Sequence, residues 1–207
     1  MAEIAKSNFD KCMDAVMVGK VSDVIDEIAK NEKCLNFLNR EITKYLVKLS
    51  QVDLSEDDKL LISTSYHTVS DIERIGDYAT NLVELSQRLV ADNAAFSDMA
   101  QRELKLIFDA VNEILTITVD AFAKGDNEAA KRIEPLEETI DDMVMILRDR
   151  HTKRLKSGAC SVGSGLVFME TLTYLERASD QCSSIAVMML ARNNENILQN
   201  HYDYLRE

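Results

Sequence analysis

Residues that break helices are scarce in this chain. The only proline among its 207 residues is Pro135, and there are six glycines. Because proline and glycine are the strongest interruptions to a helix, their scarcity favours long helices. No run of Val, Ile or Thr alternates with polar residues between turns, as a half-buried strand would require. The sequence therefore predicts an all-α protein.

Apolar residues recur at the three-and-four spacing of amphipathic helices. Val69, Ile72, Ile75, Ala79 and Leu82 mark one such stripe. Breaks are expected where caps and turn residues gather, such as Ser55, Ser97 and Gly125-Asp126-Asn127. Helices are therefore predicted over residues 3–17, 20–50, 56–91, 96–124, 127–156 and 164–192. Pro135 should kink the fifth of these helices near Ile133.

A short motif occurs twice. Glu73-Arg-Ile-Gly-Asp77 returns as Glu176-Arg-Ala-Ser-Asp180, at an offset of 103 residues. The helix before each copy carries a second pair of oxygen-bearing side chains, Glu32 with Asn36 and Glu137 with Asp141, at an offset of 105. We therefore expect six long helices arranged as two pseudo-symmetric three-helix bundles side by side, over residues 1–92 and 93–207.

The charge and the apolar segments exclude several classes of protein. A formal net charge of −12 argues against binding nucleic acid or anionic lipid. The longest apolar run, Ile185 to Ala191, is far too short to span a bilayer, and the N-terminus lacks the pattern of a signal peptide. The cysteines form no Cys-x-x-Cys pair, so we expect reduced thiols in a cytoplasmic protein.

The duplicated acids form candidate metal ligands. Residues four apart share one helix face, so Glu73 lies beside Asp77, and Glu176 beside Asp180. Helical geometry puts Glu73 and Asp77 roughly 130–170° from the apolar stripe, and it puts Glu176 and Asp180 beside Thr173 and Ser184. A cation would relieve the repulsion within each pair, and oxygen ligands suit magnesium, manganese, calcium or iron. The alternative is that these acids are merely solvated.

Other chemistry finds no support in the sequence. It has no Glu-x-x-His motif for a di-iron site and no glycine-rich phosphate loop. No basic pocket for direct phosphate binding is evident. His67, His151 and His201 are expected to be surface or loosely packed residues without a nucleophile partner. We therefore expect no enzymatic activity, and a metal-dependent hydrolase is the weaker rival.

The tandem Glu-Arg-x-x-Asp motif resembles the PhoU family of phosphate-uptake regulators. The segments 71–81 and 174–186 carry the resemblance, which extends over essentially the whole chain. It implies two three-helix bundles with metal clusters anchored by Glu73 and Asp77, and by Glu176 and Asp180. Weaker candidates for completing the metal shells are Glu32, Asn36, Glu137 and Asp141. The implied metals are iron, manganese, magnesium or zinc, with the identity open.

The resemblance has two branches. Residues 154–160 and 202–207 are similar to the cytoplasmic C-terminal domain of bacterial sodium/phosphate cotransporters, more than to free-standing regulators. The chain departs from the family pattern at Asn36, Gln181 and Ser184. The resemblance implies a regulator at the inner face of the membrane, with a phosphate transporter membrane domain or a phosphate-sensing kinase complex as partner, and a homodimer stays open. The alternative is a helical adaptor or signalling bundle without metal.

Overall fold

The chain forms a helical protein, as predicted. The computed structural model describes residues 1–18 and 21–192, and within these ranges the only regular elements are helices. They are α1 (Ala2–Val18), η1 (Val21–Asp23), α2 (Ile25–Leu49), α3 (Glu56–Ala91), α4 (Asp98–Lys124), α5 (Asn127–Ala130), α6 (Ile133–Lys156) and α7 (Val162–Ala191). The six long helices match the predicted ones to within a few residues, apart from the starts of α2 and α6. Residues 19–20, near the predicted break between the first two helices, and residues 193–207, which include His201, lie outside the described residues.

Side-chain caps fix the predicted helix starts. The Ser55 hydroxyl accepts from the Asp58 amide at the start of α3, and that of Ser97 accepts from the Ala100 amide at the start of α4. Gly125 ends α4 in the left-handed conformation, with φ of 65°. A residue with a β-carbon is disfavoured there, which explains why glycine stands at this turn.

Pro135 breaks the helix rather than kinking it. The predicted continuous helix over 127–156 divides into α5 and α6, with Lys131 and Arg132 in a turn between them. Proline has no amide proton to donate to the Lys131 carbonyl four residues earlier. Pro135 instead lies in the first turn of α6, where a missing amide costs nothing.

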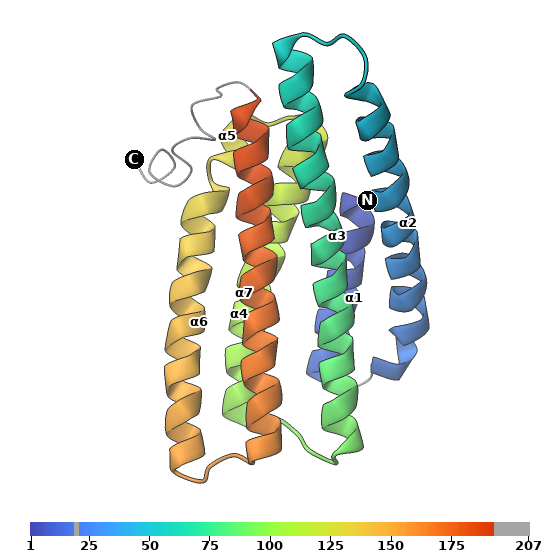
Figure 1. Ribbon diagram of the computed structural model, residues 1–207. Helices are drawn as coiled ribbons and strands as arrows, with labels where there is room; N and C mark the ends of the chain where they lie inside the picture. The colour runs from blue at the N-terminus through green and yellow to red at the C-terminus, as the bar shows by residue number, and fades with distance from the viewer. Residues whose placement is uncertain (19–20, 193–207) are drawn as a thin grey trace.

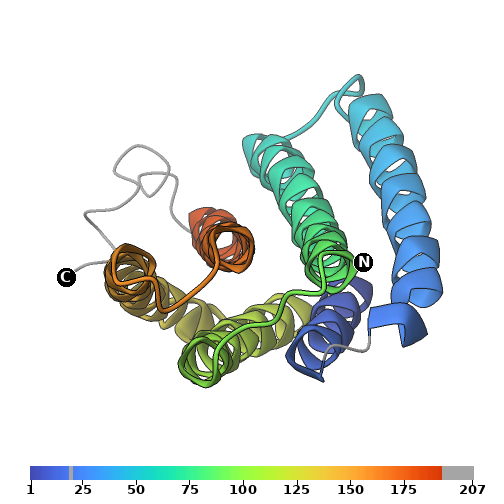
Figure 2. The same cartoon turned by 90° about the horizontal axis from the view of Figure 1, so that it is seen from below.

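The six long helices form two bundles that share one core. Helices α3 and α7 pack against each other at the centre, with α1 and α4 behind them and α2 and α6 at the outer edges (Figures 1 and 2). Phe9, Phe108 and Phe168 are fully buried in an apolar cluster that draws on both halves. The division at residues 92 and 93 stays a prediction, because the core is continuous across it.

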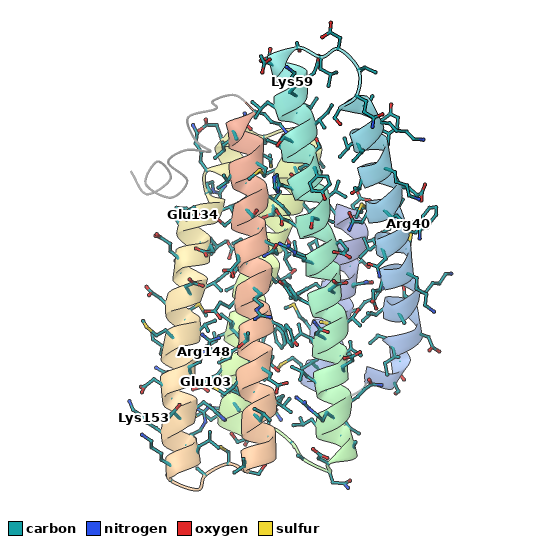
Figure 3. The ribbon with its side chains drawn as sticks, in the orientation of Figure 1. Arg40, Lys59, Glu103, Glu134, Arg148 and Lys153 are labelled. Carbon is teal, nitrogen blue, oxygen red and sulfur yellow. The ribbon has the colours of Figure 1, made fainter. Side chains whose placement is uncertain are left out.

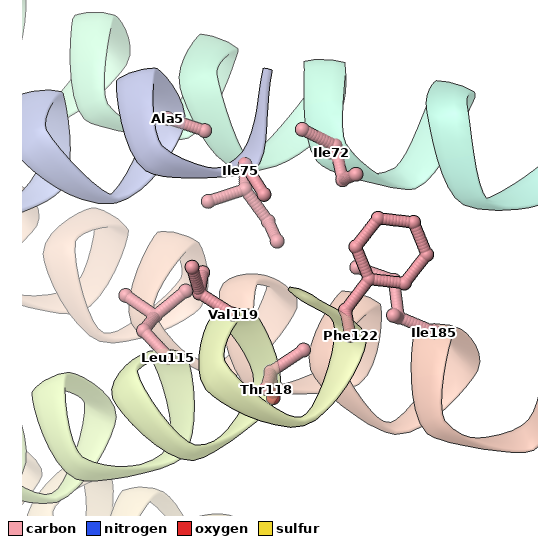
Figure 4. Close-up of a pocket in the computed structure, with 9 residues that line it drawn as sticks. Ala5, Ile72, Ile75, Leu115, Thr118, Val119, Phe122 and Ile185 are labelled. Carbon is pink, nitrogen blue, oxygen red and sulfur yellow. The ribbon is translucent and has the colours of Figure 1, made fainter. Parts of the chain in front are cut away.

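One cavity lies where the bundles meet. Ala5, Ile72, Leu115, Phe122 and Ile185 line it with four other residues (Figure 4). Its volume of about 10 Å³ is at the lower limit for one water molecule. The cavity is thus a small packing defect between the halves, with no room for a substrate.

His151 is not a surface residue, contrary to expectation. Its ring is 2% exposed and stacks on Phe168 with centroids 4.5 Å apart. The prediction failed because Arg154 and Glu103, from two different helices, form a buried ion pair next to it. None of the described helices is long and apolar enough to cross a membrane.

Candidate metal centre

Three carboxylates of the first repeat lie near one another where α2 meets α3, although among the described residues they do not form a group as close as that of the second repeat. We call Glu32, Glu73 and Asp77 cluster 1. The negative charges of Glu73 and Glu32 both act on Asp77, which is half-buried. Burial first, and then these two neighbours, raise the pKa of Asp77 to about 6. Thr80 donates to Glu32 at 3.2 Å, which holds that carboxylate on the α3 side.

A glycine in the motif explains how α2 comes so close. A β-carbon on Gly76 would lie 2.4 Å from the Leu35 Cδ1 atom. Leu35 lies one turn beyond Glu32 on α2 and is 1% exposed. The missing side chain at Gly76 thus lets Leu35 pack directly on the α3 backbone and brings Glu32 to the motif.

The second repeat forms a tighter group, cluster 2, from Glu137 and Asp141 of α6 and Asp180 of α7. One oxygen from each residue lies within 4.8 Å of the others. Burial and the charge of Asp141 are the main causes that raise the pKa of Glu137, to about 8. Burial, with Asp141 and Glu176 nearby, likewise raises the pKa of Asp180 to about 6. A side-chain hydrogen bond with Glu137 acts in the opposite direction on the pKa of Asp180.

The remaining candidate acid of this repeat, Glu176, has a different partner. Arg148 donates through Nη1 to Glu176 Oε1 at 3.1 Å and through Nη2 to Oε2 at 2.6 Å. Its Nη2 also donates to the Thr173 hydroxyl at 3.0 Å. Figure 3 shows Arg148 extending from α6 toward α7. Glu176 is therefore already neutralised by a cation of the protein itself.

Among the described residues, the predicted ligands fall into two clusters and two residues that join neither. Glu32, Glu73 and Asp77 come together in cluster 1, and Glu137, Asp141 and Asp180 in cluster 2. Glu176 lies beside cluster 2 but is bound by Arg148. Asn36 is exposed, and among the described residues no hydrogen bond joins it to cluster 1. Arg148 itself was missed, although its spacing of seven from Asp141 places both on one face of α6.

Cluster 2 passes a simple test of size. Oxygen ligands lie about 2.0–2.6 Å from magnesium or calcium, so oxygens on opposite sides of one ion are about 4–5 Å apart. The separation within cluster 2 falls at this upper limit. Small side-chain rotations would therefore suffice for Glu137, Asp141 and Asp180 to hold one hard cation. Its positive charge would oppose the burial and the neighbouring negative charges that raise the pKa of Glu137.

Gln181 and Ser184, where the chain departs from the family pattern, face the other repeat. Arg74 donates to the Gln181 side chain at 3.4 Å, and Ser184 donates to the Asp71 carboxylate at 2.6 Å. Both residues thus join α7 to α3. In this structure they link the two repeats across the central interface.

The structure also shows a basic groove that was not predicted from the sequence. Arg102 of α4 and Arg150, Lys153 and Arg154 of α6 surround an open groove of about 440 Å³. Arg154 Nη2 forms an ion pair with Glu103 Oε2 at 2.6 Å, and Lys153 Nζ forms one with Asp149 Oδ2 at 2.6 Å. Figure 3 shows Glu103 and Lys153 near the lower end of this half. Most of its positive charge is therefore already neutralised.

These features define an all-helical protein built from a duplicated three-helix unit, with an acidic cluster on each copy. The PhoU domain model matches the chain twice, at residues 1–86 and 104–189. The chain therefore belongs to the PhoU family. The two matches are offset by 103 residues, as the two copies of the motif are.

Two accessory proteins of phosphate-specific transport systems show the relationship in sequence. The PhoU homolog 1 of Thermotoga maritima is 25% identical over 161 residues, which cover 77% of this chain and 68% of that protein. The PhoU homolog of Pseudomonas putida is 27% identical over 179 residues, which cover 85% of this chain and 64% of that protein. The chain thus spans about two thirds of the length of these relatives.

Two solved structures have the same fold. PhoU from Pseudomonas aeruginosa superposes with a TM-score of 0.86 at 20% identity, covering 94% of this chain and 92% of that one. The phosphate transport system regulatory protein PhoU from Streptococcus pneumoniae gives a TM-score of 0.82 at 17% identity, covering 94% and 90%. These likenesses confirm the paired three-helix architecture.

Proposed function

We propose that this protein is a non-enzymatic regulator of phosphate transport. Its membership of the PhoU family and the names of its relatives, accessory proteins of phosphate-specific transport, support this role. Asp141 and Asp180 are exposed and the central cavity of about 10 Å³ is too small for a substrate, so neither of these places suits catalysis that must exclude water. The protein would act by contact with other components and by binding ions.

The ion-binding part of the proposal rests on one observation. Carboxylate oxygens of Glu137, Asp141 and Asp180, from two helices, lie within 4.8 Å of one another. Cluster 1 would supply the second site through Glu32, Glu73 and Asp77. Oxygen-only ligands favour manganese, magnesium or iron, and zinc is the weaker candidate because both clusters lack thiolate and imidazole.

The partner would be a membrane transporter for phosphate or a phosphate-sensing kinase complex. The protein would then act in the cytoplasm, at the inner face of the membrane. Whether it operates as a free-standing regulator or as a domain of a sodium/phosphate cotransporter is decided by the flanking reading frame. The contact is tested by purifying this protein together with the membrane component that is encoded beside it. A membrane component that does not co-purify with this protein would contradict the proposed contact.

The alternative is a helical adaptor that holds no metal. The ion pair between Arg148 and Glu176 favours it, because an internal guanidinium already performs the charge neutralisation that a metal would perform. In this case the acids of both clusters would remain hydrated or protonated. Added metal would then leave the melting temperature unchanged.

Metal analysis separates the two functions. Protein purified without chelator should contain bound metal, and the variant Glu73→Ala/Asp77→Ala/Glu176→Ala/Asp180→Ala should lose most of it. A matched control removes exposed acids outside the clusters, as Asp109→Ala/Glu113→Ala/Asp120→Ala/Glu128→Ala, and should keep its metal. Equal metal content in the two variants would rule out these acids as metal ligands and favour the helical adaptor.

A further inference from the structure

A buried histidine lies outside the two acid clusters. His151 is on α6 between Arg148 and Lys153, which Figure 3 labels in the lower half of this helix. Its ring is almost fully buried and stacks on Phe168 of α7. A β-carbon on Gly165 would lie 2.9 Å from the His151 Nε2 atom, so α7 encloses the ring closely. Charging an imidazole in such surroundings costs more than charging it in water, so this site favours the neutral ring.

Arg154 connects this histidine to a second helix. Its Nη2 atom lies 3.3 Å from His151 Nδ1 and 2.6 Å from Oε2 of Glu103 on α4. Its Nη1 atom donates to the other oxygen of Glu103 at 3.0 Å. A guanidinium has only donors, so Nδ1 must be the acceptor, and the proton of the neutral ring is on Nε2. We call His151, Arg154 and Glu103 the buried triad.

The charges that face His151 come from α4 and from α6 itself. Arg154 opposes protonation of the ring and Glu103 favours it, while Arg150 lies 3.9 Å from the Glu103 carboxylate. Helix α7 faces the ring with an aromatic side chain and with the Gly165 backbone, neither of which carries a charge. Burial, followed by the charge of Arg154, lowers the pKa of His151, and the opposing effects of Glu103 and the Gly165 backbone are smaller.

We propose that the buried triad is a pH-sensitive latch that holds the lower ends of α4 and α6 together. A proton on Nδ1 removes the lone pair to which Arg154 donates, and it places a second positive charge beside the guanidinium. Two cations in contact are unfavourable in a buried site. Arg154 must then move away, or the ring must leave its stack on Phe168. Either movement disturbs the contact that α6 makes with Glu103 of α4.

Opening the latch would change one surface of the protein. Glu103 and Arg154 line the basic groove together with Arg102 and Arg150. Asp141, the nearest acid of cluster 2 along α6, lies ten residues before His151, or about 15 Å along the helix. Mild acid would therefore alter the groove and leave both acid clusters in place.

The direction of the pH effect follows from the lowered pKa. The folded state binds the His151 proton less tightly than the unfolded chain, where the pKa is 6.5. The stability that the neutral ring contributes is complete above pH 6.5 and is lost as pH falls below it. Each pH unit below 6.5 costs up to about tenfold in the folding equilibrium, until the pKa of the folded state is reached.

Urea unfolding in chelator between pH 7.5 and 5.0 tests the latch. His151→Gln keeps a side-chain acceptor for Arg154 but does not titrate. The unfolding equilibrium constant of the wild type should therefore rise about tenfold more than that of His151→Gln across this range. His67→Gln replaces an exposed histidine and should follow the wild type at every pH. A His151→Gln variant that also follows the wild type would overturn the proposal.

Hydrogen exchange on the wild-type protein shows where it opens and requires no substitution. At pH 5.5, after correction for intrinsic exchange rates, the amides of residues 98–106 and 148–156 should lose about fivefold more protection than those of α1 and α3. An equal loss in all helices, or a loss confined to the first bundle, would overturn the latch even if His151→Gln did not fold. Both experiments are made without metal, so their result does not depend on the proposed function.

Discussion

Clusters 1 and 2 derive from the same repeated motif but differ in their surroundings. In cluster 1, Glu73 and Asp77 face Glu32 across a contact made possible by Gly76. In cluster 2, the equivalent motif acid Glu176 is bound by Arg148, and the close group forms instead from Glu137, Asp141 and Asp180. A repeated motif thus places the acids on both helices, while the facing helix determines which of them remain available for a cation.

Removing Arg148 should have the largest effect on this comparison. In Arg148→Ala, Glu176 would face Asp141 without a counter-charge, which should destabilise the metal-free protein by about 2 kcal/mol. Manganese should recover much of that loss, because Glu176 becomes an additional ligand of cluster 2. Urea unfolding with chelator and with manganese measures both effects.

The control for this change lies on the same helix. Arg150→Ala removes a guanidinium that is 60% exposed and should change stability by less than about 0.5 kcal/mol. If manganese stabilises Arg148→Ala no more than it stabilises Arg150→Ala, Glu176 is not a latent ligand.

A methyl group at Gly76 should disturb cluster 1 alone. In Gly76→Ala the new carbon would meet the Leu35 Cδ1 atom, so the buried Leu35 side chain must change rotamer or α2 must shift outward, at a cost of about 1–2 kcal/mol. An outward shift of α2 carries Glu32 away from Asp77 and should weaken metal binding at cluster 1. Gly163→Ala, where a β-carbon meets no atom within 4 Å, is the matched control. Calorimetry of both variants checks the prediction, and equal stability and metal affinity would contradict it.

The pH dependence should separate the clusters further. Folding raises the pKa of Glu137 from 4.5 to about 8, so the folded state binds its proton more tightly than the unfolded chain does. The stability that this group contributes is present at low pH and is lost as pH rises through about 8. Glu137→Gln should therefore be more stable than wild type at pH 8.5, by about 1 kcal/mol after solvent screening, and equal to it at pH 4.

Thermal melts in chelator across this pH range provide the measurement. Metal affinity of wild-type cluster 2 should rise over the same range, because the ion competes with the proton. A melting temperature of Glu137→Gln that follows wild type at every pH would show that Glu137 titrates normally.

The smallest effect is expected from transferring the arginine to the first repeat. Thr43 occupies the position equivalent to Arg148, at the offset of 105 that relates the second helices. Thr43→Arg should place a guanidinium near Glu73 and weaken manganese binding at cluster 1 by a few-fold. Thr43→Gln is the uncharged control, and equal affinity in the two variants would argue against an electrostatic effect.

Interactions within one helix could be predicted from the sequence. The stripe through Ile72 and Ala79 is buried as expected, and the four-residue spacing of the acids correctly predicts that each pair lies on one helix face. The helix caps at Ser55 and Ser97 could be predicted for the same reason, because the backbone amides that they accept from are only three residues away.

Contacts between helices were not predictable in this way. The approach of Leu35 to Gly76, the bond from Arg148 to Glu176 and the burial of His151 all depend on how two helices face each other. Helical periodicity predicts which face of its helix a residue occupies, but it does not predict which residue of the neighbouring helix lies opposite. The set of candidate acids thus came from the sequence and stays a prediction, while their grouping into two unlike clusters required the structure.

The number of manganese ions bound per chain tests the central claim most directly. Titration calorimetry on metal-free wild-type protein should give two sites, and Glu32→Ala/Asp77→Ala and Glu137→Ala/Asp180→Ala should each give one. Wild-type protein that binds no manganese, or variants that both retain two sites, would contradict the claim that these carboxylates hold cations.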